Sequence, residues 1–228
     1  MNIVHFNVYR NPNIGVFIRS NDNSVLSPPG ISADKIRQMK THLKVSNITT
    51  SIGGSNLLGA LSIMNNNGII VSKLIENYEI NILSKETGLN IQKLNSRFTA
   101  VGNLITANDY GGIVSSLVSE EQAKEISKSL KVPVKRMEIS NKQTGFSPIY
   151  LIGAMINTTN KGAIAHPIIN KDEMKIISEI LQVEVENATV NSGVPFVSSG
   201  IISNSKNILV GSQTSGPELV MLSRAFGI

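Results

Sequence analysis

The chain has 228 residues, of which 41% are hydrophobic and 4% aromatic, a net charge of +5 and no cysteine. Its length allows one large domain or two small ones, at roughly 100 to 200 residues per domain, and needs no disulfide or metal staple. The absence of cysteine excludes a thiol nucleophile, a redox pair and a cysteine-ligated zinc, and the positive charge favours an anionic partner.

The first predicted element is a strand at residues 2–9, where Val4, Phe6 and Val8 alternate with other residues. This segment lacks the basic and apolar regions of a signal peptide. No apolar run in the chain approaches the roughly 18 residues of a membrane span. We therefore expect a cytoplasmic protein with no membrane partner.

From residue 15 onward, the chain repeats one pattern five times: a glycine, an apolar strand, a polar turn and a second apolar strand. The copies begin at Gly15, Gly59, Gly102, Gly153 and Gly200. Their spacing of about 45 residues falls in the range of about 20 to 50 that is typical of repeat folds. The turns are rich in Asn, Asp and Gly, as at residues 65–68, which predicts tight hairpins.

Each hairpin is followed by a predicted helix with apolar residues at positions i, i+3 and i+7. These triplets are Ile36, Met39 and Leu43; Ile75, Tyr78 and Ile82; Ala123, Ile126 and Leu130; Met174, Ile177 and Leu181; Leu219, Leu222 and Phe226. A third strand is predicted after four of the helices, at residues 45–52, 89–94, 132–139 and 183–190. We expect residues 2–9 to supply this strand to the fifth unit.

The predicted fold is therefore of the α/β class: five ββαβ repeats closed into a ring by the N-terminal strand. We expect one domain, residues 1–228, because a repeat of about 46 residues is too small to fold alone. The predicted repeats are approximately 12–54, 55–98, 99–144, 145–193, and 194–228 together with 1–11. Closure of the ring would also remove exposed sheet edges.

The residues form no recognisable catalytic pattern. His5, His42 and His166 fall in different units without neighbouring ligands, which argues against a metal site. We therefore expect no cofactor and no enzymatic activity, and we expect function to reside in the loops that join the units. These loops should cluster on one face and lie near residues 10–14, 53–58, 99–103, 145–152 and 192–199.

Three segments, residues 51–59, 98–110 and 211–219, resemble the family of translation initiation factor six in its archaeal form, a ribosome anti-association factor. The resemblance covers essentially the whole chain. It implies a five-fold pseudosymmetric α/β propeller of the pentein type, in agreement with the repeat count. It also implies a monomer that binds the intersubunit face of the large ribosomal subunit, mainly through a ribosomal protein next to the sarcin-ricin loop. Bound there, the factor sterically prevents the small subunit from joining; large-subunit biogenesis is a second setting for this role.

The resemblance also suggests contact residues. Asn103, in the Gly102-Asn103 turn, matches a family position at the subunit-binding surface, and Gly54, Ser55 and Asn56 lie in the turn before the second anchor glycine. Asn56 falls where eukaryotic relatives carry arginine, so a contact and a plain turn role both stay open for it. The basic charge would strengthen a secondary contact with ribosomal RNA.

Two other classes of protein share features of this repeat pattern. Related penteins modify guanidino groups with a cysteine nucleophile, which this chain lacks, so only a cysteine-independent enzyme is open. A ring that encircles nucleic acid is the other alternative. That alternative fails if the central channel is narrower than a duplex, roughly 20 Å across.

Overall fold

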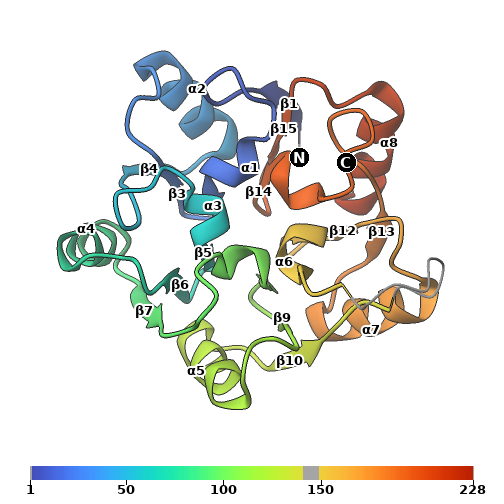
Figure 1. Ribbon diagram of the computed structural model, residues 1–228. Helices are drawn as coiled ribbons and strands as arrows, with labels where there is room; N and C mark the ends of the chain where they lie inside the picture. Colours follow the sequence, from blue (N-terminus) through green and yellow to red (C-terminus); the bar gives the residue numbers. More distant parts are fainter. Residues whose placement is uncertain (1, 141–148, 228) are drawn as a thin grey trace.

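The computed structural model describes residues 2–140 and 149–227. In this part of the chain there are five three-stranded sheets, with strand orders β2-β3-β4, β5-β6-β7, β8-β9-β10, β11-β12-β13 and β14-β15-β1 (Figure 1). The strands are β2 Arg19–Ser20, β3 Ser24–Ser27, β4 Ser46–Thr49, β5 Ser62–Met64, β6 Gly68–Ser72, β7 Asn90–Leu94, β8 Ile105–Ala107, β9 Gly112–Ser115, β10 Val134–Met137, β11 Ile156–Thr158, β12 Ala163–Ala165, β13 Val185–Asn187, β14 Ile201–Ser203, β15 Ile208–Gly211 and β1 Ile3–Phe6.

Each sheet combines an antiparallel hairpin with a third strand that runs parallel to the second. The third strands at 46–49, 90–94, 134–137 and 185–187 confirm the predicted ones with tighter bounds. In the fifth sheet β1 pairs with β15, from Ile3 opposite Ile208 to Phe6 opposite Gly211. The N-terminal segment thus completes the last sheet, as its alternating pattern predicted.

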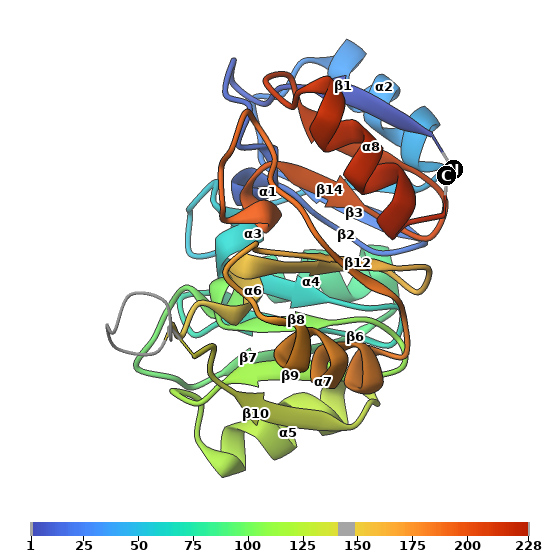
Figure 2. The same ribbon diagram turned by 90° about the vertical axis from the view of Figure 1, so that its right-hand side faces the viewer.

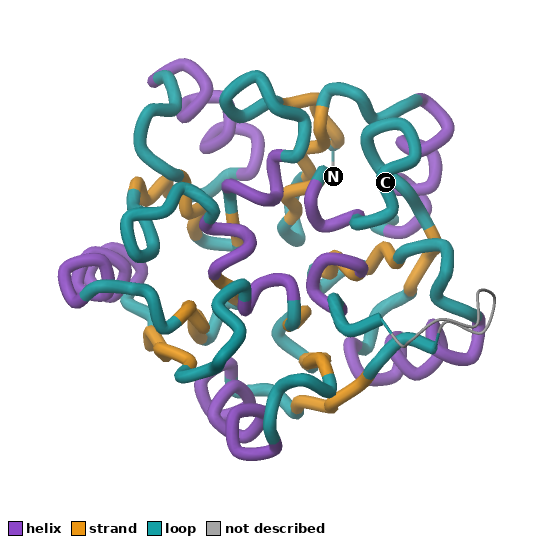
Figure 3. The backbone as a smooth tube through the Cα atoms, in the orientation of Figure 1, coloured by secondary structure: helices purple, strands orange, loops and turns teal. Residues whose placement is uncertain are grey.

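A long helix lies on the outside of each sheet (Figure 3). These helices are α2 Ala33–Leu43, α4 Asn77–Thr87, α5 Glu120–Leu130, α7 Lys171–Leu181 and α8 Gly216–Ala225. In four of them the predicted apolar triplets are buried or half-buried.

The triplet predicted for α4 is wrong by one residue. Tyr78 and Ile82 are 53% and 37% exposed, whereas Glu79 and Leu83 are fully buried. The prediction counted from Ile75, which lies before the first turn of the helix, and this shifted the register.

The first predicted strand of each hairpin begins instead as a short helical turn. These turns are α1 Ile14–Phe17, α3 Leu58–Leu61, η1 Val101–Asn103, α6 Ile152–Met155 and η2 Val197–Ser199. Four hold the anchor glycine, but in the fifth the equivalent residue is Ser198 and not Gly200. A Cβ on Gly59 would overlap the carbonyl oxygen of Gly15, and one on Gly102 would overlap that of Gly59. The small residues therefore let successive units approach closely.

The units share their cores. Each of the five hydrophobic clusters combines residues from two successive units; the second, for example, joins Leu26 and Ile48 to Ile69 and Leu83. The cluster that contains Met39 also includes Ile202 and Leu209, so the last unit packs against the first. No unit could bury its apolar face alone, which is the defining property of a repeat fold.

The two ends of the assembly differ. Figure 2 shows α1, α3 and α6 at one end, together with the loops that precede them. We call this end the loop face, defined by residues 10–14, 53–58, 99–103, 149–152 and 192–199. The five hairpin turns lie at the opposite end. This arrangement agrees with the expectation that the joining loops cluster on one face, apart from residues 145–148, which lie outside the described residues.

Candidate functional site

The loop face carries all five candidate contact residues, and it brings them together from two neighbouring units. Gly54, Ser55 and Asn56 lie in the loop before α3, where Gly54 and Asn56 are exposed and Ser55 is half-buried. Gly102 and Asn103 lie in η1. Gly102 is buried against the backbone of Gly59, so its place is in the packing of the two units. Asn103 is the half-buried residue that follows it.

The loop before α3 turns sharply at Gly53 and Gly54. Both have positive φ, +60° and +72°, a conformation that glycine adopts without steric cost. The turn is closed by reciprocal backbone hydrogen bonds between Ile52 and Ser55, at 3.2 and 3.1 Å. The two glycines thus make the turn without strain, and Ser55 and Asn56 follow directly after it.

A buried carboxylate holds this turn in place. Glu79 Oε2 accepts a hydrogen bond from the N–H of Gly53 at 2.7 Å, and its Oε1 accepts from the N–H of Gly54 at 3.1 Å and from Ser51 Oγ at 2.6 Å. Oε2 also accepts from the N–H of Glu76 at 2.8 Å, which closes the capping box at the start of α4. Burial by itself would raise the pKa of Glu79, but these hydrogen bonds outweigh it and hold the pKa below its ordinary value.

Two other units use a glutamate at the same helix position in the same way. Glu218 accepts from the N–H groups of Ser192 and Gly193, and its hydrogen bonds overcome desolvation to lower its pKa to about 2. Glu173 accepts from both the N–H and the Oγ of Ser140. These glutamates were not among the residues expected to be functional from the sequence. Their signal was the capping-box pattern, a cap residue followed three positions later by Glu.

The loop face also carries exposed apolar side chains. Leu57, Leu151 and Phe196 directly precede α3, α6 and η2, and they are 41%, 38% and 41% exposed. Tyr9 is 42% exposed, and its hydroxyl accepts a 3.4 Å hydrogen bond from Asn56 Nδ2. Apolar side chains grouped on one face are typical of a protein-binding surface. None of them was singled out from the sequence, because only the fold places them together.

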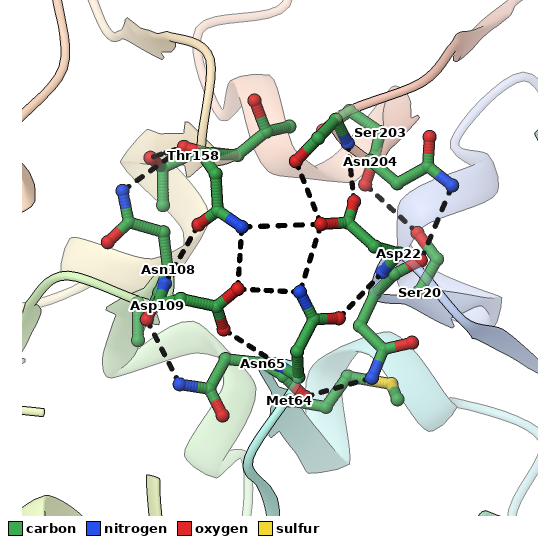
Figure 4. A pocket seen from close by; sticks show the side chains of 15 residues that line it. Ser20, Asp22, Met64, Asn65, Asn108, Asp109, Thr158, Ser203 and Asn204 are labelled. Carbon is green, nitrogen blue, oxygen red and sulfur yellow. Dashed lines mark hydrogen bonds between the residues drawn. The ribbon is translucent and has the colours of Figure 1, made fainter. Parts of the chain in front are cut away.

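The opposite end is closed by a polar ring formed by Asp22, Asn66, Asp109, Asn160 and Ser205, one residue from each hairpin turn (Figure 4). Asn66 Nδ2 donates to Asp22 Oδ2 at 2.9 Å, and Asn160 Nδ2 donates to Asp109 Oδ2 at 2.6 Å. Asn160 Nδ2 also lies 3.2 Å from Asp22 Oδ2, a hydrogen bond between the fourth unit and the first. An opening bridged by side-chain hydrogen bonds cannot admit a duplex roughly 20 Å across. The alternative of a ring that encircles nucleic acid is therefore wrong.

The three histidines lie apart, as their sequence positions suggested. His5 Nε2 is 3.0 Å from the carbonyl oxygen of Thr214, and His42 Nε2 is 2.9 Å from that of Ile208. His166 is half-buried, which lowers its pKa. Within residues 2–140 and 149–227 no group of three or more His, Asp or Glu could hold a metal ion. None of the helices in these ranges is both long enough and apolar enough to cross a membrane.

Comparison with known proteins identifies relatives along the whole chain. The model of the eIF-6 family matches residues 3–225. A protein of Nitrosopumilus maritimus named translation initiation factor 6 is 43% identical over 226 residues, 99% of each chain. Proteins of the same name from Cenarchaeum symbiosum and Staphylothermus marinus are 39% and 36% identical, over 99% and 98% of this chain and 99% and 97% of their own. The chain belongs to the eIF-6 family.

Proposed function

We propose that this translation factor binds the intersubunit face of the large ribosomal subunit through its loop face and thereby prevents the small subunit from joining. The single observation that carries the proposal is the family match over residues 3–225. The same proposal includes the fold of the family: one domain, residues 1–228, built as a five-fold pseudosymmetric α/β propeller of the pentein type. The protein acts as a cytoplasmic monomer.

A steric blocker needs a rigid body and a binding face rather than an active centre. The shared cores and the close approach at Gly15, Gly59 and Gly102 support a rigid body. The loop face offers the second requirement, because exposed Leu57 and Phe196 lie on it together with the amide of Asn103. Apolar anchors with adjacent polar groups are the usual anatomy of a protein–protein interface.

The partner on the subunit is a ribosomal protein next to the sarcin-ricin loop, with ribosomal RNA as a secondary contact. The net charge of +5 supports attraction to an RNA-rich surface. An RNA contact makes affinity fall steeply with salt, because each neutralised phosphate releases counterions. Binding that hardly changes between low and high salt would instead mean that the protein contact dominates.

The test is co-sedimentation with isolated archaeal large subunits on sucrose gradients, followed by addition of small subunits. We expect the wild-type protein to migrate with the large subunit and to reduce the amount of joined ribosome when it is in excess. An Asn103→Asp substitution should weaken binding at least tenfold without lowering the melting temperature. Asn67→Asp, at the opposite end of the molecule, is the matched control and should bind as the wild type does.

Two results would count against the proposal. Wild-type protein that stays at the top of the gradient, or that co-sediments without reducing subunit joining, refutes blocking. Equal binding by the Asn103 and Asn67 variants would remove the loop face from the interface.

A further inference from the structure

An arginine lies inside the molecule, at the centre of the five sheets. Arg19, in β2, lines a cavity together with residues from each of the other four units. The cavity wall includes Ile63, Thr106, Asn157 and Ser203. The guanidinium lies deep in the protein, although Arg19 as a whole is half-buried and keeps part of its accessible surface. Its Nη2 donates to the carbonyl oxygen of Gly59. Its Nε is buried and has no hydrogen-bond partner among the described residues.

No negative charge compensates this arginine nearby. The cavity wall contains neither Asp nor Glu, and no ion pair involves Arg19 within residues 2–140 and 149–227. The carboxylates of the polar ring, Asp22 and Asp109, do not line this cavity. Asp22 Oδ2 already accepts from Asn66, Asn160 and Ser205, so it is engaged within the ring.

The charge on Arg19 persists at neutral pH. Desolvation lowers the pKa of Arg19 to about 10, which still leaves the guanidinium protonated at pH 7. A buried charge is costly unless a counter-charge and hydrogen bonds satisfy it. The protein groups present satisfy only part of this guanidinium.

The space in the cavity beside Arg19 is of a size that suits a monatomic ion. The cavity has a volume of about 30 Å³, and one water needs at least roughly 10–15 Å³. Asn157 adds further donors, because its Oδ1 accepts from Ser203 Oγ at 2.6 Å, which directs the amide N–H groups away from that hydroxyl.

We propose that the central cavity binds one small inorganic anion, of the size of chloride, against the guanidinium of Arg19. The anion supplies the charge that the cavity wall lacks and lies against the guanidinium of Arg19. It acts as a structural ion that helps to hold the five units together at the axis. This site is independent of the loop face and of subunit binding.

The test uses bromide as the probe, because it resembles chloride and scatters anomalously. The full-length protein is refolded in sodium gluconate, and sodium bromide is then titrated at constant ionic strength. We expect the melting temperature to rise by roughly 3 to 6 °C for each tenfold increase in bromide above its dissociation constant. Crystals grown in bromide should show an anomalous peak within hydrogen-bond distance of Arg19.

An Arg19→Met variant should lose both the peak and the bromide-dependent shift. Arg37→Met, which removes an exposed arginine paired with Asp34, should keep both. The proposal is overturned if wild-type crystals show only water in the cavity, or if the anomalous peak persists in the Arg19→Met variant. Wild-type diffraction decides the matter by itself if that variant does not fold.

Discussion

The clearest test of how the loop face is built is a Glu79→Gln substitution. It keeps the size of the side chain but removes its charge and replaces one acceptor oxygen with an N–H₂ donor. In the structure the two oxygens accept from the N–H groups of Gly53, Gly54 and Glu76 and from Ser51 Oγ, at 2.6 to 3.1 Å. A glutamine must therefore point its amide group at one set of donors and leave them unsatisfied.

The size of the effect follows from these contacts. Hydrogen bonds to a charged group contribute about 1.5–3 kcal/mol each, and an unsatisfied buried donor costs about 1–3 kcal/mol. Since glutamine retains one acceptor, we expect unfolding free energy to fall by about 2–4 kcal/mol. The melting temperature should then fall by roughly 5–15 °C.

Two measurements check this prediction. Urea unfolding followed by circular dichroism gives the loss of stability, and hydrogen exchange by mass spectrometry follows the amides of Gly53 and Gly54. Exchange at these two amides should accelerate far more in Glu79→Gln than in Glu173→Gln, the same change at the equivalent helix position two units away. Affinity for the large subunit should fall as well, because the turn that presents Ser55 and Asn56 loses its support.

Stability within about 0.5 kcal/mol of the wild type, the range of ordinary surface substitutions, would refute this reasoning. So would unchanged exchange at the two glycine amides. Either result would mean that the loop keeps its conformation without the carboxylate, through the Ile52–Ser55 backbone hydrogen bonds alone.

Three further predictions concern pH, packing and the apolar surface. Because hydrogen bonds lower the pKa of Glu218 to about 2 in the folded state, its stabilising contribution should be complete above its ordinary pKa of about 4.3 and disappear as pH falls toward 2. Urea midpoints at pH 7, 4 and 2.5 should therefore decline in that order, and a constant midpoint would contradict the assignment. A Gly59→Ala substitution should destabilise the fold by about 3 kcal/mol or more, since the added methyl overlaps backbone; Gly216→Ala, where the methyl meets no atom within 4 Å, should melt close to the wild type. Leu57→Ser should weaken co-sedimentation with the large subunit at unchanged melting temperature, whereas Val220→Ser, an exposed change on α8, should leave binding intact.

Local signals in the sequence predicted most of the architecture. Five turn-rich hairpins, the third strands and the completing role of residues 2–9 all follow from periods of two and of 3.6 residues, and these survive in the structure. The errors have local causes too. Ser198 replaces the anchor glycine in the fifth unit, and the residue pattern there favoured Gly200. The helical turns that hold these residues are too short to show a period.

The candidate site was only partly accessible to the same reasoning. A joining loop near residues 53–58 was predicted, but the carboxylate that holds it is Glu79, more than twenty positions away in the chain. Its capping-box pattern was visible, although the pattern alone indicates a helix start and not a loop anchor. Leu57, Leu151 and Phe196 come from three different units, and only the folded chain places them on one face.

The sequence by itself determined the number of units, their order of elements and the chemistry that the chain lacks, because each of these depends on neighbouring residues or on composition. Only the tertiary structure decided what lies on the axis. The polar ring of Asp22, Asn66, Asp109, Asn160 and Ser205 and the buried charge of Arg19 both arise where separate units meet. No spacing along the chain records such contacts, since the residues that meet at the centre come from five different units.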